Sequence, residues 1–430
     1  MDERKLFYIN PYIREFNAVV AEAGEEKGRP YAVLSQTAFY PEGGGQPCDL
    51  GVLIIPNGKA VDKEEVPEKN EAEHDDKRGY SRMTEEYRMF LHAMHNGGDP
   101  GVRAIKVIDV HERNGEIRHY LSESIPVGTR THGIIDWDRR FDHMQQHSGE
   151  HIVSGMICKR FFCDNVGFHM GKDTITIDYN AEISFEEALR IEDEANRYIR
   201  ENHPIDISWP TEEERELIDY RSKKALSGDV RIVAFPGADC CACCGTHVRC
   251  SAEVSMVKFI SASKFHDGTR LELLCGQRAV KYLSDCWTQN KAVGVLLHAK
   301  ETETAEIVTK LHDEMAETKV RLARMEEAWF KEISEKYRGE KDVLLVTEPL
   351  TGDGVRKLAV LIGEACEGRA AVFAGEGSDY KYAVVSNGEQ AMPFVKEMNA
   401  ALNGRGGGRD SFAQGSVKAT EKEIRAYFSN

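Results

Sequence analysis

Residues 145–151 read QQHSGEH and residues 239–247 read DCCACCGTH. The first stretch places His147 and His151 four residues apart, and the second does the same for Cys243 and His247. A step of four puts two side chains on one side of a helical turn, so each pair can hold a metal ion from one side. Three imidazoles and one thiolate suit Zn²⁺, which prefers four nitrogen and sulfur donors. The sequence therefore predicts one zinc ion per chain at these four residues.

Two other interpretations of these stretches stay open. The two histidines alone could be surface residues of a helix. Cys243 has four cysteine neighbours, Cys240, Cys241, Cys244 and Cys250, which also allow a structural zinc knuckle built on the CxxC steps 240/243 and 241/244. A complete knuckle needs a second CxxC or HxxH pair nearby, and none follows in the sequence.

The composition is that of a soluble globular protein. The 430 residues leave room for two to four domains, and 41% of them are apolar and 30% charged. The chain opens MDERKLFYINPYIREF, which predicts neither a signal peptide nor a membrane span, and no stretch of 18 apolar residues follows. Eleven cysteines in such a chain indicate thiols and metal rather than disulfides. We therefore expect a cytoplasmic protein with no membrane partner.

The net charge of −16 argues against broad, non-specific binding of nucleic acid. It is compatible with a local basic surface, because affinity for phosphate depends on where the cations lie. The candidates are Arg139–Arg140, Lys159–Arg160 and the run from Arg221 to Lys224. Each of them could equally be an ordinary solvated face.

The pattern of apolar residues predicts an α+β multidomain chain that begins with a β-barrel-like domain at residues 1–125. Short alternating apolar runs at 5–55 and 102–124 indicate antiparallel strands. The acidic stretch 57–100 is expected to be an insertion on the surface of this domain. Within TAFYPEGGGQPCDLG (37–51), three successive glycines predict a loop whose backbone can approach a ligand closely. An ordinary hairpin connection is the alternative.

Three further parts are expected after the barrel-like domain. Residues 126–290 should form the α+β zinc-binding domain, with an amphipathic helix at 139–162, a second helix at 185–202 and strands at 174–179, 229–237 and 254–276. Residues 291–340 should be a helical linker. Its apolar residues recur in steps of three and four, as in a coiled coil or in a long helix packed on its own domain: Val308, Leu311, Met315, Thr318, Leu322, Met325 and Trp329. Residues 341–430 should form an α/β domain that contains the glycine-rich RGGGRDSFAQGS (405–416).

Five segments together resemble the alanyl-tRNA editing family, the freestanding relatives of the editing domain of alanyl-tRNA synthetase. They are TAFYPEGGGQPCDLG, QQHSGEH, VGFHMGKDTITIDY, the CCGTHV run and GGGRDSFAQGS. The resemblance covers essentially the whole chain, including a part similar to the synthetase's own C-terminal domain, as in the long form of the family. It implies a zinc-dependent aminoacyl-tRNA deacylase. Such an enzyme hydrolyses the ester that joins a wrong amino acid, chiefly serine and sometimes glycine, to tRNA(Ala). It also implies a homodimer formed through the C-terminal region.

The same resemblance assigns roles to residues outside the zinc pairs. Glu150 stands where the synthetases commonly have a small hydroxyl residue, and it could be a general base or a salt-bridged residue on the helix surface. Phe168 and His169 resemble the wall of the amino-acid pocket. Gly44, Gly45 and Gln46 resemble the loop that lies against the acceptor end of the tRNA.

The chemistry leaves the role of the metal open. Hydrolysis of an ester needs a polarised water and a stabilised oxyanion. Four protein ligands ordinarily close a zinc site, so the metal must either free a coordination position or only orient the substrate.

Two rival functions also stay open. HSGEH has the HxxEH form of a zinc metalloprotease helix, although that function would leave CCGTH without a role. A zinc-stabilised, non-catalytic tRNA-binding protein would fit the coiled-coil pattern and the terminal domain.

Overall fold

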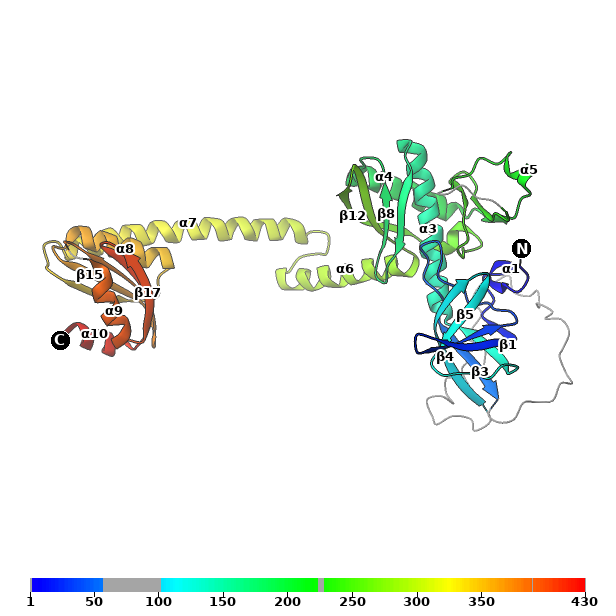
Figure 1. Ribbon diagram of the computed structural model, residues 1–430. Helices are drawn as coiled ribbons and strands as arrows, with labels where there is room; N and C mark the ends of the chain where they lie inside the picture. The colour runs from blue at the N-terminus through cyan, green and yellow to red at the C-terminus, as the bar shows by residue number, and fades with distance from the viewer. Residues whose placement is uncertain (1, 57–101, 223–227, 389, 430) are drawn as a thin grey trace. The chain divides into compact units, whose positions relative to one another are not determined.

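The computed structural model describes residues 2–56, 102–222, 228–388 and 390–429. The chain divides into two compact units at Thr288. Mixed helices and sheets, including a six-stranded barrel, confirm the expected α+β class (Figure 1), while the division into four domains stays a prediction. The expected insertion at 57–100 lies outside the described residues. Within the described ranges, no helix combines the length and the apolar character needed to cross a bilayer.

The first unit begins with a closed antiparallel barrel, in the strand order β1-β2-β5-β4-β3-β6. The strands are β1 (Glu15–Glu26), β2 (Arg29–Leu34), β3 (Gly51–Pro56), β4 (Val102–Arg113), β5 (Glu116–Leu121) and β6 (Arg130–Ile135), and a short helix, α1 (Leu6–Ile9), precedes them. β6 lies beyond the expected boundary at residue 125, yet it closes the barrel by pairing with both β1 and β3. Gly133 interrupts the apolar pattern of β6. A side chain does not fit at this position, because a Cβ would lie 2.5 Å from the ring of Phe16.

The rest of the first unit surrounds one long helix, α3 (Trp137–Phe161). A four-stranded sheet has the order β12-β13-β8-β7, and a three-stranded sheet has the order β11-β10-β9. The elements are β7 (Asn165–Met170), β8 (Ile175–Tyr179), α4 (Phe185–Glu201), β9 (Asp206–Ser208), α5 (Glu212–Arg215), β10 (Ile232–Phe235), β11 (Asp239–Ala242), the 3₁₀ helix η1 (Ser251–Val254), β12 (Val257–Phe265) and β13 (Gly268–Cys275). α6 (Gly276–Leu297) follows, so the expected boundary at residue 290 falls inside a helix.

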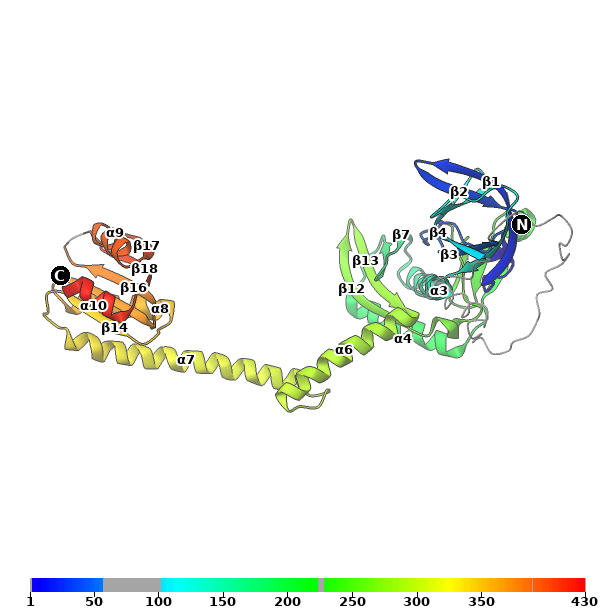
Figure 2. The same cartoon turned by 90° about the horizontal axis from the view of Figure 1, so that it is seen from below.

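Helix α3 is not the one-sided amphipathic helix that the sequence predicts. Every residue from His143 to Gly155 is buried. One side of the helix meets the barrel, where Arg140 is fully buried and pairs with Asp49. Other sides contact β7, β11 and β13, and Figure 2 shows α3 beside β7 and the barrel strands. Arg140 is therefore an internal ion pair and not part of a basic surface, which corrects the expectation for Arg139–Arg140.

The second unit is built on a five-stranded sheet in the order β14-β15-β16-β18-β17. Its elements are α7 (Thr304–Lys336), β14 (Val343–Thr347), α8 (Gly352–Ala365), β15 (Arg369–Glu376), β16 (Asp379–Ser386), α9 (Ala391–Ala401), β17 (Gly404–Arg409), β18 (Phe412–Lys418) and α10 (Glu421–Ser429). Phe330 of α7 belongs to the apolar core around α8. A second core forms around α9 and α10. The glycine-rich segment at 405–416 forms the β17–β18 hairpin at one edge of the sheet.

Candidate metal centre

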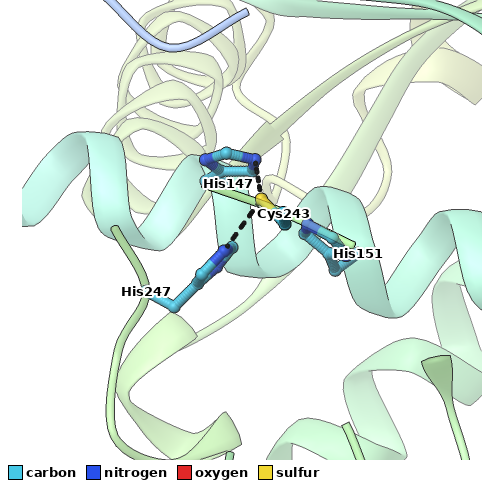
Figure 3. A group of neighbouring side chains, drawn as sticks. All are labelled: His147, His151, Cys243 and His247. Carbon is cyan, nitrogen blue, oxygen red and sulfur yellow. Dashed lines mark hydrogen bonds between the residues drawn. The ribbon is translucent and has the colours of Figure 1, made fainter. Parts of the chain in front are cut away.

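The side chains of His147, His151, Cys243 and His247 converge on one point (Figure 3). One donor atom from each residue lies within 4.8 Å of the other three. Cys243 Sγ is 3.4 Å from Nε2 of His147 and 3.4 Å from Nε2 of His247. The two histidines of α3 lie one helical turn apart, whereas Cys243 and His247 lie on the loop that follows β11. The structure thus brings together the two pairs that the sequence singles out.

Each imidazole of the group is held from behind through its Nδ1 atom. The partners are Gln46 Oε1 for His147 (2.9 Å), Asp239 Oδ2 for His151 (2.8 Å) and Ser148 Oγ for His247 (3.2 Å). With Nδ1–H donating to these oxygens, the lone pair of each Nε2 faces the group. This is the arrangement that histidine ligands of metals usually have. Three such nitrogens and one thiolate fit Zn²⁺ in number and in kind.

The electrostatics of the group favour a thiolate. Burial by itself would raise the pKa of the Cys243 thiol, but the three surrounding imidazoles lower it well below its ordinary value. Burial would lower the pKa of His151, but the Cys243 thiolate and Asp239 raise it well above its usual value. Cys243 and Asp239 therefore favour positive charge at this point, which a bound cation would supply.

Asp239 is a site residue that the sequence analysis missed. It is buried, and it accepts from His151 and also from Arg221, whose Nε and Nη2 each lie 2.7 Å from one carboxylate oxygen. Burial would raise the pKa of Asp239, but His151 and Arg221 lower it to about 2. Arg221 is thus part of the support of the metal group rather than of a solvated face, and Lys223 and Lys224 lie outside the described residues. The only signal in the sequence was the position of Asp239 at the start of the cysteine-rich run.

The glycine-rich loop positions the candidate metal ligand His147 in addition to lining the site. Backbone hydrogen bonds join Gly43 and Gln46 in both directions, at 3.0 and 3.1 Å, with Gly44 and Gly45 at positive φ between them. Such a turn requires residues that tolerate positive φ at both central positions. It delivers the fully buried Gln46 to His147 and to Thr246, where its Nε2 donates to Oγ1 at 2.9 Å. Gln46 is therefore occupied in positioning a candidate metal ligand.

Phe168 and His169 do not act as a pair. The ring of Phe168 stacks on His147 with centroids 5.4 Å apart. His169 is exposed, because successive residues of β7 point to opposite faces of the sheet. The structure thus brings Phe168 to the metal group, while the role of His169 in the amino-acid pocket stays a prediction.

Glu150 is buried, which rules out the surface salt bridge considered from the sequence. Its Oε1 accepts from Ser154 Oγ (2.6 Å) and Asn165 Nδ2 (2.7 Å). Its Oε2 lies 4.0 Å from Nε2 of His151. One carboxylate oxygen is therefore fixed by neighbours, and the other lies at the edge of the donor group.

The other cysteines stand apart from the four-donor group. Cys244 is exposed, Cys250 bonds to Glu253, and Cys241 lies near Asp239 on the other side of His151. No candidate metal group within the described residues contains two cysteines. The geometry therefore gives no support to a CxxC knuckle. Gly245, which the sequence analysis did not select, is needed for close packing, since a Cβ there would lie 2.1 Å from Cε1 of His147.

Several known proteins are similar to this chain over most of its length. No family model matches it. Alanyl-tRNA editing protein AlaX-L of Pyrococcus horikoshii is 28% identical over 440 residues, which cover 98% of this chain and 96% of that protein. The resemblance to the alanyl-tRNA editing proteins is confirmed. Alanyl-tRNA editing protein AlaX-M of Methanosarcina acetivorans is 29% identical over 59% of this chain and 90% of its own length.

Synthetases match the chain as well. Alanine–tRNA ligase of Pyrococcus furiosus is 27% identical over 99% of this chain, but the match spans only 43% of the ligase. Among solved structures, the C-Ala domain of Aquifex aeolicus alanyl-tRNA synthetase covers 21% of this chain and 92% of its own, with 19% identity and a TM-score of 0.19.

Proposed function

We propose that this chain is a freestanding deacylase of mischarged tRNA(Ala), acting chiefly on seryl esters and also on glycyl esters. The observation that carries the proposal is the four-donor group, with an oxygen partner behind each imidazole. It is supported by similarity to a protein named for alanyl-tRNA editing that extends over 98% of the chain. The proposed cofactor is one Zn²⁺ per chain. The proposed substrate-side residues are Phe168, His169, Gly44 and Gly45.

In this proposal the chain's own residues orient the ester and move the proton. When bound, Zn²⁺ would supply Lewis-acid polarisation next to the scissile ester. Glu150 is the proposed general base, because its Oε2 lies at the edge of the donor group and its other oxygen is fixed by Ser154 and Asn165. Phe168 shields one side of His147, and Gly45 packs so closely on Phe168 that a Cβ would lie 2.6 Å from its ring.

The two rival functions have less support. A metalloprotease of the HxxEH type takes a carboxylate as its third protein ligand. Within the described residues, His147 is grouped with Cys243 and His247 and with no carboxylate. A non-catalytic RNA-binding protein would leave the buried Glu150 and its two hydrogen bonds beside the metal group without a purpose.

One assay with three substrates separates these functions. Purified protein is incubated with Ser-tRNA(Ala), with Ala-tRNA(Ala) and with an unrelated peptide. We expect rapid release of serine, much slower release of alanine and no peptide cleavage. Peptide cleavage would support the protease, and no turnover of any substrate would support the binding protein.

A further inference from the structure

Arg231 is a buried cation with an unused hydrogen-bond donor beside the metal loop. Its side chain precedes β10 and is 4% exposed. Its Nη1 donates to the carbonyl oxygens of Cys243 and Gly245, each at 2.8 Å. Its Nε is buried without a hydrogen-bond partner, and no ion pair joins Arg231 to a carboxylate within the described part of the chain. A buried guanidinium without a carboxylate partner is stabilised by negative charge that approaches it.

Two aromatic rings lie on the outer side of this cation. Tyr8 of α1 lies over the guanidinium, with 5.4 Å between Cζ and the ring centroid. Trp209, just after β9, meets Tyr8 edge to face at 5.5 Å. Both rings are partly exposed. We call Tyr8, Trp209 and Arg231 the aromatic–cation patch.

The patch adjoins the metal centre and carries little competing negative charge. Arg231 is anchored on the loop that contains Cys243. The next residue, Cys244, is exposed, and its Sγ lies 3.7 Å from where a Cβ of Gly44 would be. Glu112 acts on Tyr8 electrostatically, but it is paired with Lys5 at 2.7 Å. An anionic group that approaches Arg231 therefore finds this neighbouring carboxylate already compensated.

We propose that the aromatic–cation patch binds the unpaired 3′-terminal nucleotides of the RNA substrate. A base packs on the partly exposed rings of Tyr8 and Trp209, and a backbone phosphate lies beside them, attracted by the positive charge of the buried Arg231. Aromatic stacking together with arginine contacts is the usual means of holding single-stranded RNA without duplex recognition. The inference rests on the proposed function in one respect. The ester is attached to the terminal nucleotide, so the flanking base and phosphate must lie within about one nucleotide of the metal centre.

Binding of a labelled single-stranded oligonucleotide ending in CCA to the full-length, zinc-loaded protein tests the patch. We expect Trp209→Ala to weaken binding about tenfold, as for the loss of one base–aromatic stack, and Trp209→Phe to stay within about threefold of the wild type. Trp287→Ala removes a tryptophan of α6 that is 54% exposed and should change nothing. A blunt-ended hairpin without unpaired nucleotides should bind all four proteins equally.

Equal affinity of Trp209→Ala and wild type for the CCA oligonucleotide would overturn the inference. The outcome is separable from the proposed function. If Trp209→Ala hydrolyses Ser-tRNA(Ala) with an unchanged KM, the patch fails while the deacylase stands. If the oligonucleotide binds in a Trp209-dependent way and no ester is hydrolysed, the deacylase fails while the patch stands.

Discussion

At the scale of single residues, the carboxylate of Glu150 has a fixed position and a role that one substitution tests. In Glu150→Gln the amide oxygen can still accept from Ser154 and Asn165, so the buried network is retained. A glutamine cannot take a proton from water. We expect this variant to keep its zinc and to lose roughly a hundredfold or more in the rate of deacylation, the usual contribution of a general base. Single-turnover rates and metal analysis of the same sample measure both. Near-normal turnover would show that another group activates the water.

The oxygens behind the imidazoles should matter almost as much as the ligands. Removing such a partner typically lowers metal affinity by about 10- to 100-fold, because the ring loses its fixed orientation. We expect Gln46→Ala, which frees Nδ1 of His147, to lower zinc affinity within that range in a competition titration with a chelator. Cys250→Ala is the matched control, since Cys250 bonds to Glu253 and lies outside the four-donor group. Equal zinc affinity of the two variants would mean that Gln46 does not orient the ligand.

Spacing along the chain predicted the donor group and could not predict its support. A step of four residues is a local property of a helical turn, so His147 and His151 were visible as a pair. Gln46 and His147 are 101 residues apart, and Asp239 and His151 are 88 apart. Those contacts exist only because the barrel loop and β11 both pack against α3. The burial of Arg140 could not be predicted for the same reason, because its partner Asp49 lies in the segment that leads into β3 of the barrel.

At the scale of elements, α7 presents an exposed apolar stripe. Its members recur in steps of three, four or seven residues, and most are about half exposed: Val308, Leu311, Met315, Leu322, Met325 and Trp329. A stripe of this period is typical of a coiled-coil seam, and we propose that it joins two copies of the chain. We expect the wild type to be a dimer in sedimentation experiments and Leu311→Glu combined with Met315→Glu to be a monomer. Asp313→Lys, on the same helix outside the stripe, should remain dimeric.

Truncation of the chain before α7 also tests whether this helix is needed for dimerisation. A chain that ends after Leu297, at the end of α6, keeps the barrel and the metal group and lacks the stripe. It should be a folded monomer that still binds zinc. A dimeric truncated protein, or a monomeric full-length chain, would contradict the role of α7.

Runs of glycine show why elements are only partly predictable. Gly44 and Gly45 form a tight turn with positive φ, as expected for the loop. Gly406 to Gly408 form strand β17 instead. There the absence of a side chain serves close packing, since a Cβ at Gly406 would lie 2.3 Å from the hydroxyl of Tyr382. The same composition thus gives a turn or a strand according to what lies opposite.

The sequence wrongly predicted that the buried helix α3 is amphipathic, because the layers that cover it come from distant segments of the chain.

At the scale of the whole molecule, the barrel and the region around the four-donor group lie within one compact unit. Contacts at and beside the four-donor group hold this unit together. Gln46 from the barrel side meets His147 and Thr246, and Asp49 meets Arg140. The barrel side of the unit therefore contributes directly to the candidate metal centre.

The most direct test of the central claim measures zinc content and serine release on the same samples. Wild-type protein should carry about one zinc per chain and should hydrolyse Ser-tRNA(Ala). Cys243→Ala should lose both, because removing one of four donors weakens affinity and geometry together. Cys240→Ala, whose thiol is outside the four-donor group, should keep both. If Cys243→Ala deacylates as fast as wild type, or if the zinc is lost with Cys240 instead, the proposed zinc-dependent deacylase is wrong.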